Sequence, residues 1–225
     1  MLSSYLQLLK SHPFKTNMAS ALVIFSLGDV TAQYIEHENE MPKGQMRQMP
    51  FQLDYLRMNE MVLWSAGFYT PLFYKFYNWM DVRWPKVTPF NVVRKVGAAF
   101  LLSAPINSLF FAYGVAYPHF VSTYVTRTTS SVPYSEISSD TSKKVEAELL
   151  NTMKASAALW WPANAANFAF VPPHLRAIWT SVFSVVWSTY LSLVQHRDLG
   201  GGEEEAAVVM LMRKFTKREE PNESS

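Results

Sequence analysis

Five long segments with almost no charged residues limit what this chain can fold into. Three of them contain no charged side chain, and the other two contain one each, Asp29 and Lys75. A helix needs about 20 residues to cross about 30 Å of hydrocarbon, and each segment is close to that length. The segments are residues 17–35, 61–80, 96–117, 155–173 and 177–195. A chain of 225 residues is too short to wrap five such helices in polar layers, so the sequence predicts a polytopic membrane protein.

The average composition conceals this pattern, because the mean hydropathy of −0.02 is that of a soluble protein. Charged residues make up 17% of the chain, against about 25% in a typical globular protein. The net charge of +2 gives no electrostatic footprint for nucleic acid, which we exclude as a main partner. The absence of cysteine excludes disulfides and thiolate metal sites, and the five histidines lack metal-ligand spacing. We therefore expect no metal and no cofactor.

The predicted fold class is all-α, a membrane helix bundle with about four transmembrane helices and an extra segment broken by proline. We expect an N-terminal interfacial segment at 1–16, the bundle at 17–195, and a polar, disordered tail at 196–225. Lys and Arg are equally divided between the two sides of a four-span arrangement, so the positive-inside rule gives no orientation. The expected helices cover residues 17–35, 61–80, 92–117, 145–165 and 174–195.

Prolines mark the segment that is hardest to interpret. Proline lacks a backbone donor, and the residue before it avoids the α region, so we expect a kink or break at Trp161–Pro162, at Val171–Pro172, or at both. The segment is either a kinked span or a helix that leads through the second break into the last span. The charged run at 143–150 before it is interpreted as a surface helix.

Polar residues interrupt the apolar segments at a few positions. Asp29 and Gln33 share one helix face, and a carboxylate near mid-span is a functional candidate by default. The alternative is structural, a hydrogen bond to Gln33 or a buried pair with an arginine such as Arg176. The candidates for lining a pore, or for holding the bundle together, are Asp29, Gln33, Asn107, Asn164 and Asn167. Gly28 predicts a close helix contact, and Asp54 with Arg57 is interpreted as an interfacial ion pair.

Two ordered motifs carry a family resemblance. The first is Gly-Asp-x-x-x-Gln at Gly28, and the second is Trp-Pro-x-x-x-x-Asn-Phe-x-x-Val-Pro-x-x-x-Arg from Trp161, which includes Pro162, Asn167, Phe168, Pro172 and Arg176. With them the chain resembles the peroxisomal membrane protein 2/4 family, also called the Mpv-seventeen family, from Tyr5 to Ser192. One departure concerns the third span, where Ala99 and Phe100 replace the usual Asp-Gln pair.

The resemblance implies an integral protein of the mitochondrial inner membrane or, alternatively, of the peroxisomal membrane. Members are regarded as channel-like pores for small hydrophilic solutes, or as proteins that support mitochondrial homeostasis and the stress response. The lipid bilayer is the implied partner, a homo-oligomer is possible, and no enzymatic activity is implied. The alternative function is a non-conducting membrane structural or assembly factor. The basic, acid-free N-terminus favours the mitochondrial location.

Overall fold

The computed structural model describes residues 2–40, 50–86, 88–127, 132–171 and 176–197. Contacts divide the chain into a unit of residues 1–195 and a second unit from His196, and only the first is described further. The predicted polar tail lies almost entirely outside the described residues.

The described part of the first unit is helical and contains no strand, so the predicted all-α fold is confirmed. The elements are α1 (Leu2–Ser11), α2 (Pro13–Glu40), α3 (Tyr55–Trp64), η1 (Ser65–Tyr69), α4 (Thr70–Arg83), α5 (Pro89–Phe120), η2 (Val121–Val125), α6 (Tyr134–Ala169) and α7 (Arg176–His196). Each predicted helix is present, and most extend beyond the predicted bounds. Judged by length and composition alone, two described segments, Pro13–Asn39 and Pro89–Val125, are long and apolar enough to cross a membrane. The expected number of four crossings stays a prediction.

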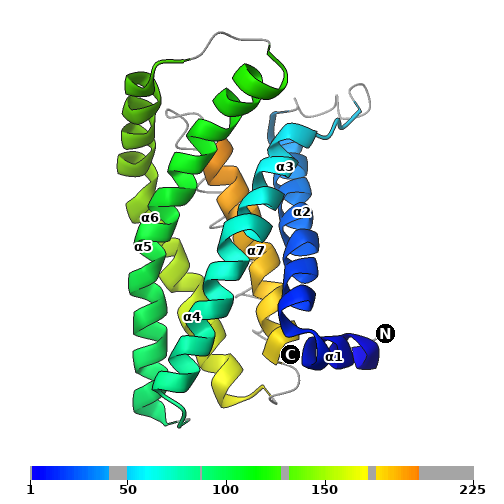
Figure 1. The fold of residues 1–225 in the computed structure, drawn as a ribbon, viewed down its shortest axis with the longest axis vertical. Helices are drawn as coiled ribbons and strands as arrows, with labels where there is room; N and C mark the ends of the chain where they lie inside the picture. The colour runs from blue at the N-terminus through cyan, green and yellow to red at the C-terminus, as the bar shows by residue number, and fades with distance from the viewer. Residues whose placement is uncertain (1, 41–49, 87, 128–131, 172–175, 198–225) are drawn as a thin grey trace, which may run out of the picture. The chain divides into compact units, whose positions relative to one another are not determined.

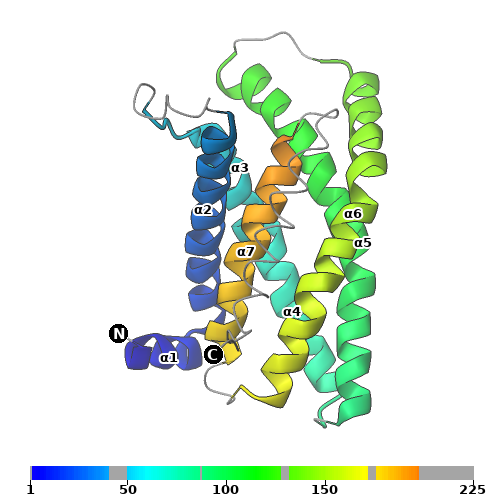
Figure 2. The same cartoon turned by 180° about the vertical axis from the view of Figure 1, so that it is seen from behind.

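Five helical rods run alternately up and down beside one another, as Figures 1 and 2 show from opposite sides. They are α2, the continuous rod α3–η1–α4, α5, α6 and α7. The short helix α1 lies across the start of α2 (Figure 1), where the Tyr5 hydroxyl and the Ser20 hydroxyl are 3.2 Å apart. Connections between the rods therefore gather at the two ends of the bundle.

Prolines explain several of the local irregularities. Pro13 and Pro89 begin helices, where a missing backbone donor has no helical partner to lose. Pro71 follows the π-helical turn η1, which adjusts the hydrogen-bond register just before a residue that cannot donate. Helix α6 continues through Pro162 and ends at Ala169. The helix therefore ends just before Val171–Pro172, one of the two expected positions, and Pro172 itself lies outside the described residues.

Candidate functional site

The buried carboxylate of Asp29 ties three helices together. Its side chain is fully buried, and one oxygen accepts from Arg57 Nε of α3 at 3.0 Å and from Ser192 Oγ of α7 at 2.5 Å. The other oxygen accepts from Gln33 Nε2, one turn along α2, at 2.8 Å. Every oxygen of this carboxylate therefore has a donor, as a buried charge requires.

Arg57 is the centre of this cluster. Besides Asp29 it contacts the carboxylate of Glu36, through both terminal nitrogens, and it donates to Ser192 Oγ from Nη2 at 2.9 Å. The interpretation of Arg57 and Asp54 as an ion pair is wrong. Asp54 instead caps α3, because its Oδ1 accepts from the backbone nitrogens of Leu56 and Arg57 at 2.9 and 3.1 Å. Because the Asp54 carboxylate accepts from these backbone nitrogens, the guanidinium of Arg57 pairs instead with Asp29 and Glu36 of α2.

Gln33 closes the cluster on the side of the 50–54 segment. Its amide nitrogen donates to the backbone oxygen of Asp54 at 3.1 Å, and its amide oxygen accepts from the backbone nitrogen of Asp54 at 2.7 Å. This pairing satisfies backbone groups just before α3 begins. We call Asp29, Gln33, Glu36, Arg57 and Ser192 the arginine cluster.

Gly28 explains how α7 comes close enough to take part. A Cβ atom at Gly28 would lie 1.9 Å from Ser188 Oγ and 2.9 Å from the backbone nitrogen of Thr189. Ser188 Oγ in turn donates to the backbone oxygen of Ile24 at 3.2 Å. Small residues on both helices allow this approach and bring Ser192, one turn further along α7, to Asp29.

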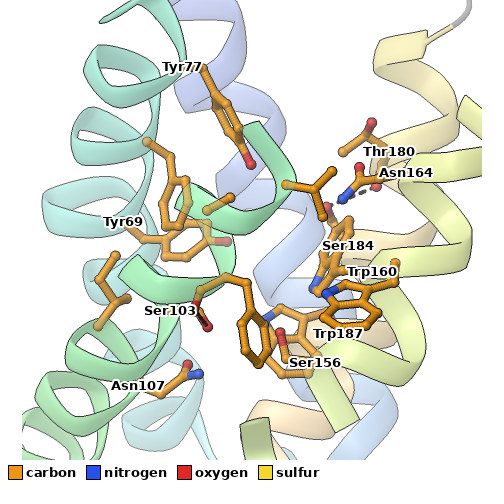
Figure 3. A pocket seen from close by; sticks show the side chains of 16 residues that line it. Tyr69, Tyr77, Ser103, Asn107, Ser156, Trp160, Asn164, Thr180, Ser184 and Trp187 are labelled. Carbon is orange, nitrogen blue, oxygen red and sulfur yellow. Dashed lines mark hydrogen bonds between the residues drawn. The ribbon is translucent and has the colours of Figure 1, made fainter. Parts of the chain in front are cut away.

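A cavity of about 180 Å³ lies elsewhere in the bundle, between α4, α5, α6 and α7 (Figure 3). Its polar lining consists of hydroxyl and amide side chains from three helices: Ser103, Asn107, Ser156, Asn164, Thr180 and Ser184, with the phenols of Tyr69 and Tyr77. Its apolar lining is largely aromatic: Phe73, Phe100, Trp160, Trp161 and Trp187, with Val96, Ala99 and Ile106. Among the residues that the structure describes, none of the lining side chains is an acid, a lysine, an arginine or a histidine.

Local contacts fix the orientation of this lining. Ser103 Oγ donates to the backbone oxygen of Phe100 at 2.7 Å and lies 3.3 Å from Met153 Sδ. Ser184 Oγ donates to the backbone oxygen of Thr180 at 2.9 Å. Hydroxyl groups bonded to their own helix in this way keep acceptor lone pairs for a solute. The rings of Trp160 and Trp187, from neighbouring helices, have their centroids 6.5 Å apart.

The structure separates the predicted polar residues into two groups. Asn107 and Asn164 line the cavity, whereas Asp29 and Gln33 belong to the arginine cluster. Asn167 is buried, and its Nδ2 donates to Thr180 Oγ1, a hydroxyl of the cavity lining, at 3.3 Å, whereas its Oδ1 has no partner among the described residues. Among the motif residues, Trp161 lines the cavity and Pro162 lies within α6. The side chains of Phe168 and Arg176, like Pro172, lie outside the described residues.

Sequence reasoning missed a second set of buried polar residues. On α6 they recur every fourth position, at Lys144, Glu148, Thr152 and Ser156, and each is less than a tenth exposed. The interpretation of residues 143–150 as a surface helix is therefore wrong for this face of α6. Glu60 of α3 and Gln195 of α7 are buried as well. The repeat of four was visible in the sequence and is the spacing of one helix face.

Within the described ranges, no group of three or more acidic or histidine side chains is arranged to hold a metal ion. The two acids of the arginine cluster are engaged with a guanidinium instead.

Comparison with known proteins places the chain beside one family. The sequence model of the Mpv17 / PMP22 family matches residues 136–192. The chain is similar to "PXMP2/4 family protein 2" of Dictyostelium discoideum, with 28% identity over 84% of this chain and 87% of that protein. It is also similar to "Mpv17-like protein" of Xenopus laevis, with 22% identity over 86% and 82%. "Mitochondrial inner membrane protein Mpv17" of Danio rerio shows 25% identity over 84% and 93%. No solved structure matches significantly.

Proposed function

We propose that this chain, which belongs to the Mpv17 / PMP22 family, is a multi-pass protein of the mitochondrial inner membrane that forms a channel-like pore for small solutes. The name of the Danio rerio relative supports this membrane, and none of the relatives named above is described as an enzyme. The peroxisomal membrane is the alternative location. Imaging a tagged chain against markers of both organelles tests the location, and a purely peroxisomal signal would overturn the mitochondrial assignment.

Apolar side chains on the outside of the rods support contact with lipid. Leu22 and Leu27 of α2, Leu101 and Leu109 of α5, and Val182 of α7 are all exposed. In water each would leave apolar area solvated, whereas in a bilayer the same faces meet hydrocarbon. This outward apolar surface, with charge buried inside, is the arrangement that a membrane protein requires.

The cavity between α4, α5, α6 and α7 is the observation that carries the pore proposal. Hydroxyl and amide groups from three different helices converge on one space among otherwise apolar rods. Polar side chains in a membrane bundle face an interior path or a partner, because hydrocarbon satisfies neither. A lining of this kind replaces part of the hydration of a solute that enters it.

Filling the cavity tests the proposal. Ala99→Phe places a ring in the cavity lining, whereas Leu101→Phe, two residues along α5, changes a side chain that is 76% exposed. In vesicles containing the purified protein, osmotic swelling in small solutes should fall several-fold for Ala99→Phe and stay unchanged for Leu101→Phe. Thermal midpoints of both variants in detergent verify that they remain folded. If the folded unsubstituted protein passes no solute, the pore proposal is wrong.

The alternative is a non-conducting structural or assembly factor, in which the polar residues only hold the bundle together. The arginine cluster favours it, since each of its acids is engaged by Arg57 and none faces the cavity. Vesicles that contain folded protein but swell no faster than protein-free vesicles would support this alternative.

A further inference from the structure

The cavity has hydrogen-bonding groups on opposing walls. Ser103 and Asn107 come from α5, Ser156 and Asn164 from α6, and Thr180 from α7 (Figure 3). An amide both donates and accepts, and so does a hydroxyl. A solute that carries hydroxyl groups along its length can therefore replace its hydrogen bonds to water by hydrogen bonds to side chains of α5, α6 and α7.

Between these polar groups stand aromatic faces. Trp160 and Trp187 lie side by side on α6 and α7, and the Phe100 and Trp161 rings have centroids 5.6 Å apart. Flat apolar rings pack against the C–H faces of a small molecule while the neighbouring polar groups fix its orientation. A polyhydroxylated carbon chain has both kinds of surface.

The described part of the lining carries no side chain with a formal charge, although charged side chains are buried elsewhere in the bundle. Asp29 is paired with Arg57 in the arginine cluster. Lys144 and Glu148 lie in the N-terminal half of α6, whereas the cavity residues Trp160 and Asn164 lie in its C-terminal half. An ion that entered a weakly polar cavity would lose hydration without gaining a counter-charge. A neutral solute avoids that loss.

The size of the cavity limits the solute. An engineered protein cavity of about 150 Å³ binds benzene, a molecule of six non-hydrogen atoms. A space of about 180 Å³ therefore suits a molecule of about six to eight non-hydrogen atoms. Three- and four-carbon polyols fall in this range.

We infer that the cavity is a binding site for small uncharged polyhydroxylated solutes, and that it selects them over ions of the same size. This inference rests on the proposed pore and names its substrate class. Selection comes from the absence of charge among the described lining residues, and from the neutral hydrogen-bonding groups that they present between aromatic faces.

The experiment compares erythritol with lactate at pH 7, since both are small hydroxylated molecules and only lactate is charged. Proteoliposomes should swell at least ten times faster in erythritol than in sodium lactate, after subtraction of protein-free vesicles. A potassium chloride gradient across a planar bilayer should give little ionic current. Equal rates for erythritol and lactate would overturn the inference and leave the pore standing. No permeation by either solute would instead overturn the pore.

Two substitutions at one position isolate the effect of charge. Ala99→Asn and Ala99→Asp introduce side chains of nearly equal size into the lining, and only the second is ionised. The preference for erythritol over potassium ions should persist in Ala99→Asn and fall several-fold in Ala99→Asp. If both variants keep the same selectivity, the neutral lining does not determine what passes.

Removal of hydrogen-bonding groups gives an independent measurement. Asn164→Leu keeps roughly the same volume but removes an amide from the lining, and Asn78→Leu does the same at an exposed position of α4. Erythritol swelling should fall several-fold in the first variant and stay constant in the second. An unchanged rate for Asn164→Leu would show that the cavity groups do not bind the solute.

Discussion

Asp29 is the residue for which sequence and structure give the sharpest comparison. The sequence left open a pore carboxylate or a structural one, and the structure places it away from the cavity, bonded to three side chains. We predict that Asp29→Asn lowers stability by about 2 kcal/mol, because the amide weakens the contact to Arg57 while Glu36 still pairs with it. Arg57→Gln should cost about 3 kcal/mol or more, since it leaves two acids without the guanidinium.

Thermal midpoints in one detergent measure these effects, and Thr31→Val provides the control. Thr31 is exposed, and its hydroxyl bonds only the Leu27 carbonyl of its own helix, so its loss should change stability little. The erythritol permeability of Asp29→Asn should equal that of the unsubstituted protein. A large loss of permeability with an unchanged midpoint would place Asp29 in the conducting path, contrary to this assignment.

Gly28 gives a second prediction at the residue scale. Gly28→Ala should destabilise the protein by about 1–3 kcal/mol, because the added methyl group meets the backbone of α7 as well as Ser188. Gly97→Ala on α5 is the matched control, since nothing lies within 4 Å of the added atom there. It should gain about 0.5–1 kcal/mol from helix propensity. Equal midpoints for the two variants would mean that α2 and α7 are not in close contact.

At the scale of the helix, α6 carries a polar face that a charge count does not reveal. Lys144 is buried and its neighbour Lys143 is exposed, and the same contrast holds for Glu148 and Glu146. Substitution to Gln should lower the free energy of unfolding by about 2 kcal/mol or more at the buried members, and change it by at most about 0.5 kcal/mol at the exposed ones, as read from thermal midpoints. Midpoints that fall equally within each pair would show that α6 does not turn this face inward.

The helices were predictable because absence of charge over about 20 residues is a strong signal. Helix ends were less so: α6 begins at Tyr134, well before the predicted residue 145, because a polar sequence can continue a helix whose inner face is buried. A kink or break was expected at Pro162, at Pro172 or at both, and α6 continues through Pro162 and ends at Ala169. The π-helical turn η1 left no pattern beyond Pro71.

The candidate site was predictable only in part. Asn107 and Asn164 were chosen as polar residues inside apolar segments, and both line the cavity. Arg57 was assigned the wrong partner, because Asp54 is three residues away in sequence whereas Asp29 is 28 residues away. Contacts between distant helices depend on how the rods pack, which one sequence does not specify. The periodicity of Lys144, Glu148, Thr152 and Ser156 was available but hidden by the expectation of a surface helix.

At the scale of the whole bundle, two zones of the polar interior differ in chemistry, and we propose different roles for them. The arginine cluster joins α2, α3 and α7 through charges that satisfy one another, whereas the cavity joins α4 to α7 around neutral groups. The structural role and the proposed conducting role therefore fall to different sets of helices, which share only α7. Variants in the first zone should change midpoints, and variants in the second should change permeability, which allows the two to be separated on the same sample.

The arrangement of the rods also predicts how often the chain crosses the membrane. Helix α6 has 36 residues, about 54 Å of helix, and it runs beside α5 in the opposite direction (Figures 1 and 2). Its C-terminal half contains no charge from Ala155 to Ala169. If α5 crosses the bilayer, a helix of this length packed along it must cross as well. We therefore expect five crossings rather than the four that the sequence suggested.

Cysteine accessibility measures this directly, because the chain contains no cysteine and each introduced thiol is the only one to react. The starts of α3 and α6 lie at one end of the bundle, and the start of α5 and the end of α6 lie at the other (Figures 1 and 2). Gln52 lies just before α3, Ser135 lies in the first turn of α6, and Thr88 and Phe170 flank the start of α5 and the end of α6; all four side chains are exposed. With five crossings, a membrane-impermeant maleimide added to sealed vesicles of uniform orientation should label one of these pairs and spare the other. Detergent should then expose all four, which verifies that each thiol is reactive. If Ser135→Cys and Phe170→Cys react from the same side, α6 does not cross the membrane and the four-span arrangement is correct. In that case the wall of the cavity formed by α6, which includes Asn164, would lie outside the hydrocarbon, and the pore would need another path.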